Sequence, residues 1–173
     1  MERRQADRVC ASSEVDAQDR GFGGSRRSPL TLYLDTSSLV KLYVQEVGSE
    51  EVRNFVAQAA VVSTSIVAYP ETRAALARLR RSGDLTPAKF AAAKRNFEEQ
   101  WPAFLTLEVT AAVSREAGDF AERYALRGFD ALHLASFAEV ARRAGPSDTR
   151  FSSFDDPLNK AARDIARRLS AGL

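Results

Sequence analysis

The chain has 173 residues, of which 45% are hydrophobic, so it is long enough for one well-formed core and short for two. Its 25 basic and 23 acidic residues nearly balance, so the net charge does not by itself indicate a polyanionic partner. One cysteine and one histidine exclude a disulfide framework and a zinc site of Cys and His. The sequence has neither an apolar run of roughly 20 residues that would span a bilayer nor a secretory signal, and we expect a cytoplasmic protein with no membrane partner.

Residues 1–29 contain charged residues, Ser and Gly, and almost no large apolar side chains. They show neither a helical nor a strand period, and such segments bury too little apolar surface to offset the entropy lost on ordering. We therefore expect a disordered leader that derives from an upstream start codon or an artificial extension. Residues 30–173 are expected to form a single domain.

From residue 30 onward, short apolar runs alternate with longer amphipathic runs, which predicts strands separated by helices. The predicted order is strand 30–34, helix 37–44, helix 49–60, strand 61–64, helix 71–82, helix 86–101, strand 104–109, helix 110–126, helix 129–145, strand 149–154 and helix 156–169. Such alternation requires right-handed crossovers and a parallel sheet. The predicted fold class is α/β, a three-layer α/β/α sandwich with a central sheet of four to five strands.

Proline and glycine residues mark several of these boundaries. Thr86 followed by Pro87 indicates a helix start, and Gly83 supplies the stop of the preceding helix. Pro70 stands directly before Glu71 and has no backbone N–H. A kink or a delayed helix start is therefore predicted at that position.

Acidic residues fall near the carboxyl ends of the predicted strands. Asp35 follows the first strand, and Asp155 and Asp156 follow the fourth. Glu71 lies early in the helix after the second strand, and Asp130 lies at the start of helix 129–145. Ligands bind at this edge of parallel α/β sheets, so the sequence predicts one acidic site there.

Each acid also has a structural interpretation, because Asp is among the best N-cap residues. Asp35, Asp130 and Asp155 all stand where a predicted helix begins, and taken singly capping is the commoner role. Capping does not require these acids to share one end of one sheet, and clustered carboxylates repel unless a counter-charge is present. A divalent cation resolves that conflict, and ligation by oxygen alone suits Mg²⁺ or Mn²⁺ better than zinc or copper.

The other polar candidates have less specific patterns. His133 lies three residues after Asp130, near enough to touch the site, and we interpret it as a helix-packing residue. Ser37 and Ser38 have no nearby histidine and no nucleophile-elbow pattern, so they are expected to cap the helix or hold Asp35. Two arginine clusters are either phosphate contacts or solvated helix faces: Arg73, Arg78, Arg80 and Arg81, and Arg163, Arg167 and Arg168.

Four motifs in this order resemble the PIN-domain ribonucleases, specifically the VapC-type toxins of bacterial type II toxin–antitoxin systems. They are "LDTSSLVKLY" with Asp35, "YPETRAAL" with Glu71, "RGFDALHLA" with Asp130 and "FSSFDDPLNKAA" with Asp155. The resemblance implies a five-stranded parallel sheet between helices, although the chain ends at "RRLSAGL", so the fifth strand is expected to be absent or vestigial. It also implies an RNA substrate, a Mg²⁺ or Mn²⁺ cofactor, a cognate antitoxin that covers an apolar groove, and a homodimer.

In this interpretation Asp35, Asp130 and Asp155 hold the metal, and Glu71 orients the attacking water or takes its proton. Ser37 and Ser153 are expected to hydrogen-bond the carboxylates, and Asp156 could substitute for Asp155.

Three alternatives remain at this stage. An aspartyl-phosphate phosphatase would need a second Asp two residues after Asp35, where the chain has Ser37. A PIN nuclease of RNA processing would have no antitoxin. A non-catalytic interaction module would use the acids only as caps.

Overall fold

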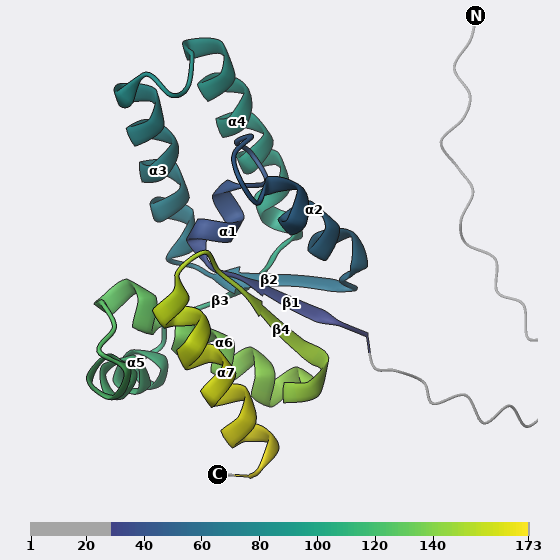
Figure 1. Ribbon diagram of the computed structural model, residues 1–173, viewed down its shortest axis with the longest axis vertical. Helices are drawn as coiled ribbons and strands as arrows, with labels where there is room; N and C mark the ends of the chain where they lie inside the picture. The colour runs from purple at the N-terminus through teal and green to yellow at the C-terminus, as the bar shows by residue number, and fades with distance from the viewer. Residues whose placement is uncertain (1–28, 173) are drawn as a thin grey trace, which may run out of the picture.

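The computed structural model describes residues 29–172, in which four parallel strands form one sheet (Figure 1). The strands are β1 Thr31–Leu34, β2 Val61–Ser65, β3 Leu105–Leu107 and β4 Thr149–Ser152, in the order β3-β2-β1-β4. No fifth strand occurs within residues 29–172. The predicted leader, apart from its last residue, lies outside the described part of the chain.

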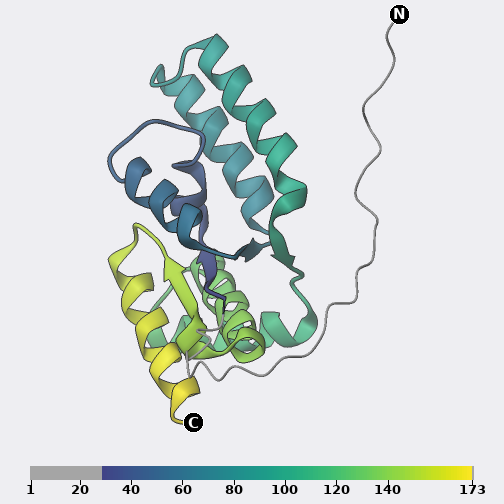
Figure 2. The ribbon, with the colours of Figure 1, turned by 90° about the vertical axis from the view of Figure 1, so that its right-hand side faces the viewer.

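Seven α-helices of the described chain cover the two faces of the sheet (Figures 1 and 2). One face carries α1 Thr36–Val40, α2 Ser49–Gln58, α3 Ala68–Ser82 and α4 Pro87–Gln100, and the other carries α5 Ala111–Tyr124, α6 Gly128–Ala144 and α7 Asp156–Ser170. Short 3₁₀ turns, η1 Trp101–Ala103 and η2 Pro146–Asp148, precede β3 and β4. The three-layer α/β/α prediction is confirmed.

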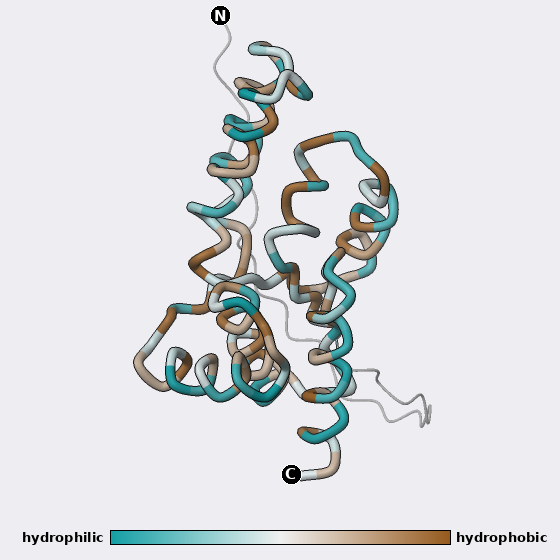
Figure 3. Tube along the Cα trace, turned by 60° about the vertical axis from the view of Figure 1, so that its left-hand side comes forward, coloured by the Kyte–Doolittle hydropathy of each residue, from teal (hydrophilic) through white to brown (hydrophobic). Residues whose placement is uncertain are grey.

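None of the helices within residues 29–172 is long and apolar enough to cross a membrane. In Figure 3 hydrophilic residues recur along most of α7, which ends beside the C-terminus. Its buried residues are Leu158, Ala161, Ala162 and Ile165, which follow helical spacing on a single side. The helix therefore packs on the sheet through one stripe and leaves the rest to solvent.

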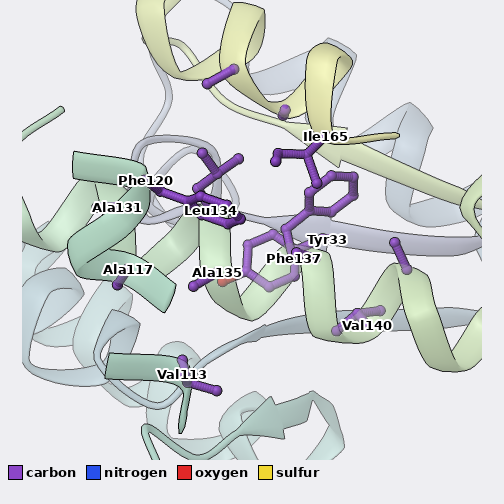
Figure 4. Close-up of a cluster of buried hydrophobic side chains, with 14 of the residues drawn as sticks. Tyr33, Val113, Ala117, Phe120, Ala131, Leu134, Ala135, Phe137, Val140 and Ile165 are labelled. Atoms are coloured by element: carbon purple, nitrogen blue, oxygen red, sulfur yellow. The ribbon is translucent and has the colours of Figure 1, made fainter. Parts of the chain in front are cut away.

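Alternation along β1 divides the core between the two faces of the sheet. The Tyr33 ring faces α6 and stacks on Phe151, with ring centroids 5.6 Å apart, inside the cluster drawn in Figure 4. Leu32 and Leu34 point the other way and pack with Phe97 and other side chains of the helices on that face. All of the β1 side chains are thus buried, which explains the continuous apolar run in the sequence.

The strand order determines where a ligand site forms. The chain runs outward from β1 to β2 and β3, then crosses back to place β4 on the opposite side of β1. β1 and β4 pair in register, with Leu34 beside Ser152, so the segments that follow both strands begin side by side. This is the topological switch point at which α/β sheets bind ligands.

The helix after β2 departs from the sequence prediction at its start. α3 begins at Ala68, two residues before Pro70, so the predicted delayed start is wrong. Pro70 lies in the first turn, where a backbone N–H has no intrahelical acceptor and its loss costs little. α3 ends at Gly83, which has a φ of 90° that favours glycine, and α4 then returns alongside it as a hairpin that projects from the sheet (Figure 2).

Candidate active site

The carboxylates of Asp35, Glu71, Asp130 and Asp155 all line one cavity of about 630 Å³. The cavity lies at the carboxyl ends of β1 and β4, with α3 and α6 forming its walls. The acids come from separate segments of the chain, and only the fold brings them together. Asp156 lines a different cavity, with Tyr124 and other residues, so the structure does not place it beside the four acids.

Asp35 is held by a set of short hydrogen bonds directly after β1. Its backbone N–H donates to the carbonyl of Ser152 (3.1 Å), which continues the β1–β4 pairing by one residue. Its Oδ1 accepts from the N–H of Ser38 (2.9 Å) and from the hydroxyl of Ser37 (2.8 Å), and its Oδ2 accepts from the hydroxyl of Ser153 (2.7 Å). The carboxylate therefore caps α1 and lines the cavity at once, and the predicted roles of Ser37 and Ser153 toward Asp35 are confirmed.

Burial has the largest effect on the acidity of Asp35. The residue is only 5% exposed, and desolvation raises the pKa of its carboxyl even though the serine hydroxyls and the Ser38 N–H oppose the shift. A buried carboxylate with a raised pKa gains from a nearby cation, because the cation lowers the cost of holding the negative charge. Asp35 is the least solvated of the four acids, so it would gain most from a nearby cation.

Glu71 is bound at one carboxylate oxygen by two side chains. Its Oε2 accepts from the hydroxyl of Thr36 (2.5 Å) and lies 2.9 Å from Nε2 of His133. Burial alone would raise the pKa of Glu71, but the bonds to His133 and Thr36 outweigh burial and lower the pKa. Glu71 is consequently ionised at neutral pH.

His133 does more than pack the helix, so the packing interpretation was incomplete. The ring is 2% exposed on α6, and besides Glu71 it reaches Oγ1 of Thr36 (3.0 Å) through Nε2 and the hydroxyl of Tyr33 (3.1 Å) through Nδ1. Burial raises the pKa of the Tyr33 hydroxyl well above its usual range, so the hydroxyl keeps its proton. The ring thus contacts Tyr33 of the sheet core through one nitrogen and Glu71 through the other, so the core of the sheet orients the glutamate.

Asp130 and Asp155 differ in the way they meet their helices. Asp130 lies in the first turn of α6 and caps nothing; its Oδ2 pairs with Nε of Arg127 at 2.8 Å, so the capping interpretation is wrong for this residue. Asp155 is the N-cap of α7, and its Oδ1 accepts from the N–H of Leu158 at 2.8 Å. The capping interpretation is right for Asp155, whose carboxylate nevertheless lines the acid cavity.

The four acids of this cavity suit a hard divalent cation by their chemistry, because such ions prefer oxygen ligands. As the side chains stand, no three Asp, Glu, His or Cys residues within 29–172 are arranged to hold a metal ion. Asp130 is paired with Arg127, and Asp35 is engaged at both oxygens by serine hydroxyls. The carboxylates thus suit Mg²⁺ or Mn²⁺ by their chemistry, and a bound ion would require side chains of the cavity to move.

Three residues of the site were not singled out from the sequence. Thr36 follows Asp35 directly, and Arg127 precedes Asp130 by three residues, a spacing that places two side chains on the same helix face. Lys41 is buried in the cavity wall, where its ammonium bonds to Glu46 and lies 4.2 Å from the ring centroid of Phe154. Helical spacing could have revealed Arg127, whereas the contact of Lys41 with Phe154 depends on the fold.

Comparison with known proteins adds the family of the chain. Residues 32–157, more than half of the sequence, match the family described as PIN domain. Two curated relatives, the ribonucleases VapC45 and VapC49 of Mycobacterium tuberculosis (strains CDC 1551 / Oshkosh and ATCC 25618 / H37Rv), are each 44% identical over 109 residues, which cover 63% of this chain and 76% of the relative.

Solved structures with the same fold are more distant in sequence. VapC20 of Mycobacterium tuberculosis, described as a sarcin–ricin loop cleaving toxin, has a TM-score of 0.55 at 22% identity, covering 75% of this chain and 94% of VapC20. PAE2754 of Pyrobaculum aerophilum has a TM-score of 0.55 at 21% identity, with 82% and 90% covered. FitAcB of Neisseria gonorrhoeae has a TM-score of 0.52 at 18% identity, with 76% and 93% covered.

These structural likenesses agree with the parallel sheet and flanking helices described above. The family match over residues 32–157 also spans all four acids. The chain belongs to the PIN-domain family, within which the two curated relatives are VapC ribonucleases.

Proposed function

We propose that this chain is a Mg²⁺- or Mn²⁺-dependent endoribonuclease that acts as the toxin of a toxin–antitoxin pair. The observation that carries the proposal is the convergence of Asp35, Glu71, Asp130 and Asp155 on one cavity. Membership of the PIN-domain family and the VapC ribonuclease relatives support RNA as the substrate and the toxin role.

The four acids divide between two roles in this proposal. Asp35, Asp130 and Asp155 would hold the ion, which when bound supplies positive charge at the scissile phosphate and acidifies a bound water. Ser37 and Ser153 keep the Asp35 carboxylate oriented through their hydroxyls. Glu71 is bound at Oε2, so Oε1 is left to orient the attacking water or to take the proton of that water. The lowered pKa of Glu71 keeps the carboxylate ionised.

The alternatives account for less of the site. A phosphatase with an aspartyl-phosphate intermediate needs an acid at position 37, where Ser37 is instead bonded to Asp35. A module that uses its acids only as caps leaves Glu71 and Asp130 unexplained, because neither caps a helix. A PIN nuclease of RNA processing would share these acids, and the VapC names of the relatives favour the toxin instead.

An apolar cavity beside the acids supports the proposed antitoxin. Its volume is about 600 Å³, and it lies between α5 and α6, with Glu71, Arg127 and Asp130 shared with the acid cavity. Phe129 contributes to its wall and is 55% exposed, an uncommon state for a large aromatic side chain. An antitoxin segment that buries this surface would lie across the acids.

We also propose that the chain forms a homodimer. Sedimentation of the purified chain would measure its oligomeric state.

Cleavage of single-stranded RNA by the purified chain tests the catalytic proposal. Wild type should cleave with millimolar Mg²⁺ or Mn²⁺ and lose activity in EDTA, because the ion supplies the charge at the phosphate. Asp35→Asn and Asp130→Asn should each lower the rate by about 100-fold or more, equivalent to roughly 3 kcal/mol of transition-state stabilisation.

The matched control is Asp156→Asn, which removes an equal charge one residue from Asp155 but outside the acid cavity, and it should cleave like wild type. Undiminished cleavage by both Asp35→Asn and Asp130→Asn, or full activity in EDTA, would refute the proposal.

A further inference from the structure

The cavity that holds the four acids has oppositely charged ends. Asp35 and Asp155 lie at the end formed by the sheet, where β1 and β4 finish. Farther out, α3 extends away from the sheet within the α3–α4 hairpin (Figure 2), and Arg78 and Arg81 of that helix line the same cavity. One continuous cavity therefore joins a site suited to a cation with a wall suited to anions.

The spacing along α3 explains why these side chains share one wall. Glu71, Ala74, Ala75, Arg78 and Arg81 all line the cavity, at intervals that keep them on one face of a helix. With a rise of 1.5 Å per residue, the arginines lie about 10 and 15 Å along the axis from the glutamate. The alanines between them have short side chains, so the wall stays open from the acids to the arginines.

Arg78 and Arg81 differ from the other cations of the cavity, because neither pairs with an acid in the described part of the chain. Lys41 bonds to a neighbouring glutamate at 2.8 Å, and Arg127 bonds to Asp130 at 2.8 Å. Within residues 29–172, the guanidinium groups of Arg78 and Arg81 make no ion pair or hydrogen bond. Both groups are exposed, and their charge is available to a ligand in the cavity.

The other arginines of α3 show that this arrangement is not a general property of the helix. Arg73 is paired with Glu98 of α4 and lies over the ring of Tyr69, so it braces the hairpin. Arg80 is exposed but does not line the acid cavity. The arginine cluster seen in the sequence therefore divides into a structural member, an outward-facing member and the cavity pair.

We propose that Arg78 and Arg81 bind two backbone phosphates of single-stranded RNA, on one side of the phosphate that is cleaved at the acids. The inference rests on the proposed function and specifies how its substrate is held. A guanidinium group presents two parallel N–H donors that match the non-bridging oxygens of a phosphate. The acids repel a polyanion, so unpaired cations on the same cavity wall supply the attraction that brings RNA to them.

Binding of a fluorescently labelled single-stranded RNA, measured by anisotropy in EDTA over a series of KCl concentrations, tests this inference. For single strands, each phosphate contact contributes about 0.7 to the slope of log K against log salt. Arg78→Gln and Arg81→Gln should each lower the slope by about that amount, which is about fivefold in affinity for each tenfold change of salt. Arg80→Gln, with the same charge change on the same helix, should keep the wild-type slope.

Three outcomes overturn the inference: wild type that does not bind RNA, equal slopes for wild type and both cavity variants, or equal losses in all three arginine variants. If the cavity variants weaken binding of poly-L-glutamate and leave the RNA slope unchanged, the wall is a site for an acidic polypeptide and the inference is also wrong. EDTA prevents the proposed cleavage, so the slopes are independent of catalysis. If the chain does not cleave RNA but the binding slopes change as predicted, the proposed function alone is rejected. If the chain cleaves RNA normally but the arginine variants keep the wild-type slope, only the phosphate contacts are rejected.

Discussion

Asp35 combines two roles, helix capping and membership of the acid cavity, which the sequence alone presents as alternatives. It caps α1 through the N–H of Ser38, and it lines the acid cavity with its charge largely removed from water. The serine hydroxyls that orient it are too weak to offset burial, because the pKa of Asp35 remains raised. Without a cation, the residue is placed at some cost to the stability of the folded chain.

The raised pKa of Asp35 predicts a pH dependence of stability in EDTA. Above about pH 3.9 the unfolded carboxyl loses its proton first, so the folded state holds more protons and stability falls as pH rises toward the folded pKa. The free energy of unfolding of wild type, minus that of Asp35→Asn, should therefore decrease between pH 4 and neutral pH. Urea titrations at a series of pH values measure both.

Asp164 provides a control of opposite sign. The hydrogen bond from Arg168 lowers its pKa, so the free energy of unfolding of wild type minus that of Asp164→Asn should be nearly constant above about pH 5 and should fall as pH is lowered through about 3.9 and below. A difference for Asp35 that rises between pH 4 and neutral pH would contradict the effect assigned to burial.

At the scale of elements, helix starts deliver the acids to the switch point. α1 and α7 begin directly after the paired strands β1 and β4, and their N-caps are Asp35 and Asp155. Asn caps a helix about as well as Asp, whereas Ala does not cap. The two contributions of such a residue can therefore be separated by substitution.

Substitutions at Asp155 should affect stability and activity differently. Asp155→Ala should lower the free energy of unfolding by about 1 kcal/mol because the N–H of Leu158 loses its acceptor, and Asp155→Asn should stay within a few tenths of wild type. Both should lose metal-dependent RNA cleavage. Chemical denaturation and the cleavage assay measure the two effects.

Thr86 is the matched control, because it caps α4 by accepting from the N–H of Lys89, away from the acid cavity. Thr86→Ala should lose comparable stability and keep its activity. Retained cleavage by Asp155→Asn would show that the aspartate is only a cap.

For the whole molecule, a bound ion would couple the four acids to global stability. An ion that binds only the folded chain stabilises it by mass action, by about 2.7 kcal/mol at a concentration of 100 times Kd. The apolar core and the sheet already hold the acids near one another, so binding requires side-chain movement and not refolding. The ion pair between Arg127 and Asp130 must open for that movement.

Thermal unfolding with and without Mg²⁺ should reveal this coupling. We expect Mg²⁺ to raise the melting temperature of wild type and to have much less effect on Asp130→Asn. In EDTA the two proteins should melt at similar temperatures, because the lost pair with the exposed Arg127 offsets relief of repulsion among the acids. Arg127→Gln keeps every carboxylate and removes the competing cation. Its melting temperature should therefore rise at a lower Mg²⁺ concentration than that of wild type. A full Mg²⁺ response in Asp130→Asn would exclude Asp130 as a ligand.

The sequence by itself determined the layers of the fold and the segments that carry the acids. The period of apolar residues differs between strands and helices, and alternation of the two requires a parallel sheet whose strand ends meet at one edge. The position of Asp35 after β1 and of Asp155 after β4 followed from that local pattern alone. Resemblance of the motifs then indicated the family, which the match over residues 32–157 established.

Only the tertiary structure decided what each side chain contacts. His133 reaches Glu71 because α6 packs against β1 and α3 stands across the same strand ends, and no spacing within one helix encodes that meeting. Pro70 proved harmless because it falls in a first turn, and Asp156 turned out to line another cavity although it adjoins an acid of the site. Local patterns depend on neighbours along the chain, whereas contacts between side chains depend on the packing of distant segments, which the three-dimensional fold alone determines.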